Sequence, residues 1–182
     1  MEEKIKSPSE DELRSEYASR KMRIVARDAG PRTLFPNDGR ERKTLMGEVR
    51  VKVKLTNAGD EVLVRRGLLT ADKIRSYEAD ALVDTGAVRS ALPIHVVQRL
   101  GLATVGKARA LYANDTAEDV DLTEVVGIDI DGRRTTEETL VIGSEVLIGQ
   151  TVLESLDLLV DCVTHRVIPN PAHPDQPMLK MK

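Results

Sequence analysis

The run Ala81-Leu82-Val83-Asp84-Thr85-Gly86-Ala87 constrains this chain most, because an apolar strand ends there in a carboxylate, a hydroxyl and a glycine. Gly86 permits backbone angles that a side chain would forbid, so the chain can turn sharply after the strand. Its N–H can also approach a carboxylate closely, which suits an aspartate held by hydrogen bonds rather than by a salt bridge. The pattern predicts an acid–base aspartate on a tight loop, although ordinary turns also favour these three residue types.

A second apolar element that ends in glycine lies further along the chain. It is Val146-Leu147-Ile148-Gly149-Gln150, and a short helical pattern follows over residues 151–156. Together, Ala81–Ala87 and Leu147–Gly149 resemble the motifs of the retropepsin-type aspartic proteases, in the form carried by small bacterial proteins. The resemblance extends from about Met46 to Pro169 and so covers most of the chain.

The resemblance implies a mainly β fold, namely a retropepsin-like closed β-barrel (the acid protease fold) with one or two short helices, acting as a homodimer. The alternation of apolar and charged residues over Val49–Leu55 predicts a half-buried strand. A turn is expected at Asn57–Asp60 and a second short strand at Glu61–Arg65. Pro93 and Gly101 bracket a short helix, with Pro93 as its first residue.

Several hairpins are expected after that helix. Lys107–Ala113 and Val120–Ile130 predict the two arms of one hairpin, with its tip within Tyr112–Glu118. In the family that the chain resembles, this hairpin is the flap that folds over the bound peptide. Asp131-Gly132 is a strong signal for a further hairpin turn. The remaining strands are expected at residues 138–142, 158–161 and 166–168.

We expect three parts along the chain. Residues 1–45 form a flexible, charged N-terminal extension, partly helical over Glu12–Arg27, and a docking arm or a removable pro-segment is the alternative interpretation. Residues 46–169 form the retropepsin-like domain. Residues 170–182 form a C-terminal tail that contains prolines and has no regular structure.

Composition and charge exclude several classes of protein. The formal net charge of −3 and an aromatic content of 2% argue against nucleic-acid binding. The start lacks the apolar core of a signal peptide, and no apolar run reaches the length of a membrane span, so we expect a cytoplasmic protein with no membrane partner.

The cysteine and the histidines give no sign of a metal or redox site. Cys162 is the single cysteine, so no internal disulfide is expected, and we interpret it as a small core residue. The three histidines, His95, His165 and His173, do not have the spacing of metal ligands. No cofactor or metal is expected, and a metal-binding β protein is the least favoured interpretation.

Aspartyl proteolysis needs two carboxylates in contact. One takes a proton from a water, which attacks the scissile carbonyl, and the other is protonated and donates a hydrogen bond to the carbonyl oxygen. Two like charges at contact cannot both persist, so the pair shares a proton. This chain has one Asp-Thr-Gly, so the second Asp84 must come from a second copy related by a twofold axis.

The resemblance also implies roles for individual residues. In the catalytic loop, Asp84 performs the chemistry, Thr85 braces the two loops across the axis, and the Gly86 N–H holds the carboxylate. The implied substrate-binding residues are Ala87, Tyr112, Ala113, Asn114, Leu147 and Ile148. The last two line apolar pockets and the floor beneath the loop. Gln150 stands where many viral relatives carry an arginine that ties the helix to the loop.

The predicted function is an aspartic endopeptidase, a hydrolase that cleaves peptide or protein substrates as a homodimer. The alternative is a non-catalytic dimerisation or peptide-binding module that keeps the retropepsin fold, because a fold does not by itself establish a function.

Overall fold

The structure is a computed structural model that describes residues 47–112 and 115–178. These residues belong to one unit of the chain. The predictions for residues 1–45, and those for Ala113 and Asn114, lie outside the described residues.

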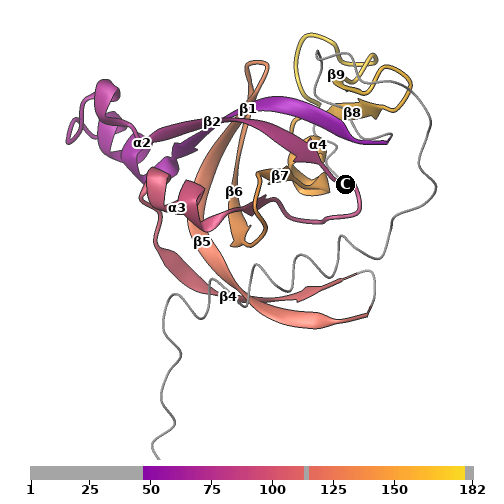
Figure 1. The fold of residues 1–182 in the computed structure, drawn as a ribbon. Helices are drawn as coiled ribbons and strands as arrows, with labels where there is room; N and C mark the ends of the chain where they lie inside the picture. The colour runs from indigo at the N-terminus through magenta and orange to yellow at the C-terminus, as the bar shows by residue number, and fades with distance from the viewer. Residues whose placement is uncertain (1–46, 113–114, 179–182) are drawn as a thin grey trace, which may run out of the picture. The chain divides into compact units, whose positions relative to one another are not determined.

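Six strands close into a barrel (Figure 1). Their order around the barrel is β1 (Val49–Asn57), β2 (Ser76–Val83), β7 (Leu147–Ile148), β3 (Ala91–Leu92), β6 (Arg133–Val141) and β5 (Ala117–Ile130), and β5 pairs with β1. Outside the ring, β4 (Thr104–Leu111) pairs with β5, while β8 (Leu158–Asp161) and β9 (Arg166–Pro169) form a separate hairpin. The mainly β closed barrel is therefore confirmed.

The core of the barrel is aliphatic. Along β1, the alternate residues Val49, Val51, Val53 and Leu55 are at most 8% exposed, whereas Lys52 and Lys54 between them are exposed. The strand predicted from this alternation is confirmed. None of the buried hydrophobic residues in the described part of the chain is aromatic, and Tyr77 packs at the edge of the cluster.

The turn between β5 and β6 has the geometry that its sequence predicts. Asp131 and Gly132 have φ angles of 50° and 81°. Ile130 is in register with Arg133, so the hairpin loop contains two residues, both of them left-handed. Such turns match the natural twist of two antiparallel strands, and asparagine, aspartate and glycine tolerate their angles best.

The helix after the Asp84 loop is also confirmed. α3 (Ile94–Leu100) buries Val96, Val97 and Leu100, while His95 on its other face is exposed. Gly101 ends the helix with a left-handed φ of 59°. Pro93 differs from the prediction, because it is the N-cap residue rather than the first helical residue.

The turn expected at Asn57–Asp60 and the strand at Glu61–Arg65 are wrong, because α2 (Ala58–Arg65) occupies this segment. The Asn57 side chain accepts a hydrogen bond from the Asp60 N–H at 3.1 Å, which caps the first turn of the helix. Asp60 and Glu61 place negative charge at that N-terminal end, where the helix dipole stabilises it. With α3 and α4 (Gln150–Ser155), the described residues hold three short α-helices and one 3₁₀ turn, η1 (Ala71–Lys73), rather than one or two helices.

Cys162 is exposed, so its interpretation as a core residue is wrong. It begins the four-residue turn between β8 and β9, where one carboxylate oxygen of Asp161 accepts hydrogen bonds from the N–H groups of Val163 and Thr164. A tight turn of this kind directs its side chains outward. The average burial of cysteine therefore did not decide its position.

The described part of the tail, residues 170–178, contains no helix or strand and lies against its own domain. The Asp157 carboxylate pairs with the Asn170 amide at 2.8 Å and with Nδ1 of His173 at 2.7 Å. The Arg133 guanidinium donates to the carbonyl oxygens of His173 and Pro174, each at 2.9 Å. Among the described residues, none of the helices is long and apolar enough to cross a membrane.

Asp60→Asn should destabilise the domain in a pH-dependent way. The buried Asp60 carboxylate accepts hydrogen bonds from Nε of Arg75 at 2.8 Å and from its backbone N–H at 3.0 Å. The side-chain hydrogen bonds from Arg75 lower the pKa of Asp60, although burial opposes them. The variant should lose about 1.5–3 kcal/mol in free energy of unfolding at neutral pH, as is typical of hydrogen bonds to charged groups.

The sign of the pH dependence follows from the lowered pKa. The carboxylate stabilises the fold above the ordinary aspartate range, and this contribution is lost as the pH falls through the folded value. Urea denaturation should be measured at neutral pH and near the acid limit of folding. The difference in free energy of unfolding between wild type and variant should become smaller in acid. The exposed Asp72→Asn is the matched control. An equal difference in free energy of unfolding at both pH values would contradict a stabilising role of the ionised Asp60 carboxylate.

Candidate functional site

Parallel pairing of β2 with β7 brings the two sequence motifs together. Leu82 is in register with Leu147, and Val83 with Ile148. The Asp84 N–H donates to the carbonyl oxygen of Ile148 at 3.0 Å. Residues more than sixty positions apart along the chain therefore fix the point at which β2 ends and the Asp84 loop begins.

The loop holds the Asp84 carboxylate while leaving it accessible. One carboxylate oxygen accepts the Gly86 N–H at 2.8 Å, and the Ala87 N–H donates to the Asp84 carbonyl at 3.2 Å. A Cβ atom at Gly86 would lie 3.2 Å from the same carboxylate oxygen, so glycine gives that oxygen room. Asp84 is half-buried, and Thr85 and Gly86 are exposed. The arrangement presents an oriented carboxylate to solvent.

Backbone contacts tie helix α4 to this loop. The Gln150 N–H donates to the Ala87 carbonyl at 2.8 Å. The N–H and hydroxyl of Thr151 both donate to the Val88 carbonyl, at 3.1 and 2.7 Å. The Gln150 amide instead bonds Glu154 of its own helix at 2.7 Å. Thr151, which the sequence analysis did not single out, thus contributes the side-chain tie between helix and loop.

Gly149 is needed because the loop passes against it. A Cβ atom there would lie 2.5 Å from the carbonyl carbon and 2.7 Å from the carbonyl oxygen of Arg89. These are backbone atoms, so no side-chain rotation relieves the contact. The glycine that follows the second apolar motif therefore permits the loop and α4 to pack closely.

A buried carboxyl group lies behind the loop. The Ser90 hydroxyl donates to Glu137 at 3.0 Å and accepts the Gly149 N–H at 3.1 Å. The Ser90 N–H also points at Glu137, at 3.4 Å. Burial raises the pKa of the Glu137 carboxyl group, and the hydrogen bonds from Ser90 partly offset this. Sequence reasoning missed both residues; the available signal was a charged residue at an inward-facing position of β6.

The residues expected to bind substrate are distributed over the loop, β7 and the β4–β5 hairpin. Ala87 and Leu147 are half-buried, and Ile148 is fully buried in the core. Tyr112 lies just beyond β4, is 37% exposed, and its hydroxyl is 3.3 Å from a Glu118 carboxylate oxygen. Ala113 and Asn114 lie outside the described residues.

The predicted hairpin is confirmed, since β4 and β5 pair antiparallel. Leu111 is opposite Ala117 at the tip, and Thr104 is opposite Thr123 at the base. Residues that are paired across neighbouring strands connect the base of this hairpin, on β5, with β2, which leads to Asp84. In order across β5, β6, β3, β7 and β2, they are Leu122, Leu140, Ala91, Leu147 and Leu82. In the view of Figure 1, the hairpin and the loop after β2 extend toward the same side of the barrel. The three segments expected to form the site thus belong to one continuous sheet.

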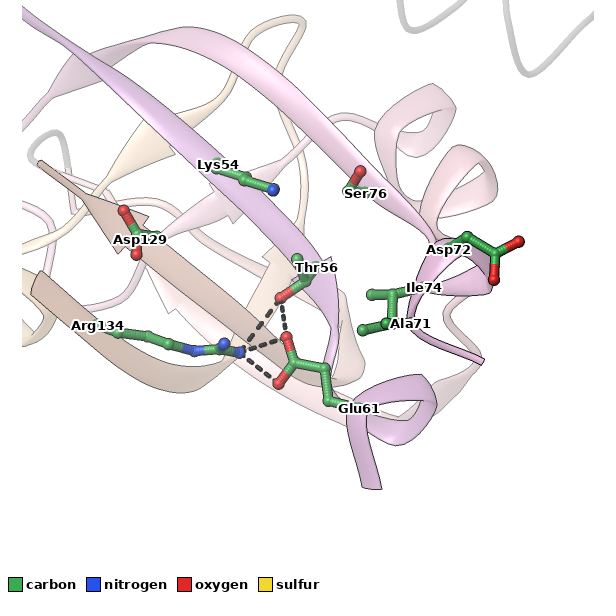
Figure 2. A pocket seen from close by; sticks show the side chains of 9 residues that line it. All are labelled: Lys54, Thr56, Glu61, Ala71, Asp72, Ile74, Ser76, Asp129 and Arg134. Atoms are coloured by element: carbon green, nitrogen blue, oxygen red, sulfur yellow. Dashed lines mark hydrogen bonds and ion pairs between the residues drawn. The ribbon is translucent and has the colours of Figure 1, made fainter. Parts of the chain in front are cut away.

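A pocket of about 400 Å³ lies elsewhere, between β1, α2, η1 and the β5–β6 hairpin. Its lining residues are Lys54, Thr56, Glu61, Ala71, Asp72, Ile74, Ser76, Asp129 and Arg134 (Figure 2). Glu61 points at Arg134 and forms an ion pair with it, and it also accepts the Thr56 hydroxyl at 2.6 Å. None of the predicted site residues lines this pocket, and its central contacts anchor α2 to the barrel.

Across residues 47–112 and 115–178, no group of three or more histidine, cysteine, aspartate or glutamate side chains is arranged to hold a metal ion.

No protein-family model and no curated protein matches this chain. Among solved structures, the retroviral protease-like domain of Ddi1 from Leishmania major matches with a TM-score of 0.42 and 13% identity, over 73% of this chain and 94% of that one. EIAV protease complexed with the inhibitor HBY-793 matches with a TM-score of 0.39 and 18% identity, over 63% of this chain and 92% of that one. At such values, these matches assign neither an activity nor a substrate to this chain.

Gly149→Ala should destabilise the domain, because the added methyl group would overlap the Arg89 backbone. We expect a loss of about 1–3 kcal/mol in free energy of unfolding, as is usual for overpacking. Chemical denaturation measures it. Gly106→Ala is the matched control, since no atom beyond its chain neighbours lies within 4 Å of its added Cβ. Equal stability of Gly149→Ala and wild type would show that the loop and α4 are not in close contact.

Proposed function

We propose that this protein is an aspartic endopeptidase of the retropepsin type, in which two Asp84 carboxylates, one from each chain of a homodimer, activate the attacking water. The observation that carries the proposal is the Asp84 loop itself. Its carboxylate is oriented by the Gly86 N–H at 2.8 Å, its backbone is held by β7, and it remains open to solvent. A fixed orientation and access from solvent are what a general base requires.

The need for a second chain follows from the chemistry. General base and general acid must both be carboxyl groups in contact, and the chain has one Asp-Thr-Gly. Thr85 and Gly86 are exposed on the same loop, so the loops of two copies can meet there about a twofold axis. In the proposed dimer, the Thr85 side chains brace the loops, and the two Asp84 carboxyl groups share one proton.

Substrate binding is proposed for the loop, β7 and the hairpin. Ala87, Tyr112, Ala113 and Asn114 would contact the peptide backbone. Leu147 and Ile148 would line apolar pockets and the floor beneath the loop. The exposed apolar side chains of Val88 (71%) and Leu111 (73%) lie next to these residues in the chain and agree with a peptide that has apolar side chains.

A non-catalytic dimerisation or peptide-binding module is the second candidate. Gln150 favours it, because its amide bonds Glu154 in α4 and adds no side-chain tie to the Asp84 loop. The two candidates differ in one outcome. The module would bind peptides without cleaving them.

Asp84→Asn should abolish peptide cleavage while leaving the fold intact, because the amide is nearly isosteric but cannot serve as the base. A peptide library incubated from pH 4 to 8 with wild type and variant should show a loss of about a thousandfold or more. Asp80→Asn, on the exposed face of β2, is the matched control and should cleave as wild type does. Cleavage retained by Asp84→Asn would overturn the mechanism, and peptide binding without cleavage by wild type would favour the module.

Mixing the two proteins tests the shared site directly. If each site needs one Asp84 from each chain, a mixed dimer is inactive. After random exchange of subunits, an equal mixture should retain about one quarter of the wild-type activity rather than one half. Specific activity should also fall on dilution as dimers dissociate. A linear loss of activity with added variant, or full activity in a monomer at sedimentation equilibrium, would refute the two-chain site.

A further inference from the structure

Glu137 differs from the other buried charged side chains of the described residues. Asp60 and Glu61 each form an ion pair with an arginine, and Arg133 donates to four backbone carbonyl groups. Glu137 is 8% exposed, and within residues 47–112 and 115–178 its side chain accepts hydrogen bonds from Ser90 alone. Arg89 attracts this carboxyl group electrostatically, but among the described residues no arginine or lysine forms an ion pair with it. Burying a carboxyl group without a direct ionic partner is costly, so its position calls for a specific role.

The contacts of Ser90 lead directly to Asp84. Ser90 is fully buried, and its hydroxyl oxygen accepts the N–H of Gly149. That N–H belongs to the peptide group whose carbonyl oxygen, on Ile148, accepts the N–H of Asp84. A peptide group is planar, so fixing the direction of its N–H also fixes the direction of its carbonyl. One rigid unit therefore links the Ser90 hydroxyl to the backbone of Asp84.

We propose that Glu137 and Ser90 act as a positioning pair for the Asp84 loop, orienting the Ile148–Gly149 peptide group that holds the Asp84 backbone. The expected effect of this pair on peptide cleavage rests on the proposed function, whereas its effect on the position of the loop does not. Neither residue touches the expected substrate. Both act through the backbone that carries Asp84.

The carboxyl group suits this task because Ser90 presents two donors to it. The two oxygens of Glu137 accept the Ser90 hydroxyl at 3.0 Å and the Ser90 N–H at 3.4 Å. The hydroxyl proton then points at Glu137, and a lone pair is left for the Gly149 N–H. A glutamine side chain has one acceptor, so its NH₂ group would face one of the two donors. Whichever way the amide is turned, one of the two hydrogen bonds that hold Ser90 is lost.

Amide hydrogen exchange tests the pair without relying on activity. In the full chain, Glu137→Gln and Ser90→Ala should each speed exchange at the Asp84 and Gly149 amides by about five- to tenfold, as expected for loosening of one buried hydrogen bond. Glu138→Gln is the matched control, since it is the next residue of β6, is half-buried and pairs with Arg89 at 3.7 Å instead. Unchanged exchange at both amides in a folded Glu137→Gln would overturn the proposal.

Steady-state kinetics of peptide cleavage tests whether the positioning pair affects catalysis. Glu137→Gln should lower kcat for peptide cleavage by about five- to tenfold with KM nearly unchanged, because the base is misplaced while the binding residues remain. Glu137→Gln combined with Ser90→Ala should be no slower than Ser90→Ala alone, since both changes break one chain of contacts. If the losses in kcat of the two single variants multiplied in the double variant, or if Glu137→Gln changed KM alone, a positioning role would be contradicted.

The two proposals fail in different ways. If wild type does not cleave any peptide, the proposed function fails, and the exchange rates still decide whether the pair positions the loop. If wild type cleaves and Glu137→Gln matches it in both exchange and kcat, the pair fails and the proposed function stands. If Ser90→Ala does not fold, Glu137→Gln carries the test, and its thermal midpoint is compared with that of Glu138→Gln.

Discussion

The hydrogen bond from the Asp84 N–H to the Ile148 carbonyl is the contact on which the site depends. It exists because β2 and β7 pair in parallel, with Val83 opposite Ile148. Parallel neighbours need a long connection between them. Here that connection includes α3 and β4, as well as three of the six barrel strands, β3, β5 and β6. The position of one short strand, β7, thus determines where the carboxylate lies, and closing the barrel is what holds β7 there.

The loop around Asp84 is held mainly by backbone groups. Carbonyl groups of Ala87 and Val88 accept hydrogen bonds from the first residues of α4, and Gly149 lets the two segments approach closely. Backbone contacts have no side-chain entropy to lose, and they leave the outer face of the loop free. This explains how Thr85 and Gly86 remain exposed on a segment whose ends are fixed. Glu137 contacts the segment that follows this loop from within the domain, through Ser90.

Patterns with a local physical cause were predicted well. The alternation along β1 and the Asp131-Gly132 turn depend on neighbouring residues alone, and both were found as expected. α2 was missed because Gly59 and the β-branched valines weaken a helical signal, while its stability comes from distant partners, Arg75 and Arg134. Cys162 was misplaced because residue type gives an average burial, whereas its place in the β8–β9 turn depends on how those strands pair.

The sequence by itself determined the chemistry that the site can attempt. One Asp-Thr-Gly after an apolar strand limits each chain to one candidate catalytic carboxylate, and a second apolar motif ending in glycine indicated its neighbour. Only the tertiary structure decided what supports that carboxylate. Ser90, Glu137 and Thr151 meet the loop through contacts between segments far apart in the chain, and no spacing in the sequence encodes such contacts. The physical reason is that a side chain's hydrogen-bond partner depends on which strands become neighbours when the barrel closes.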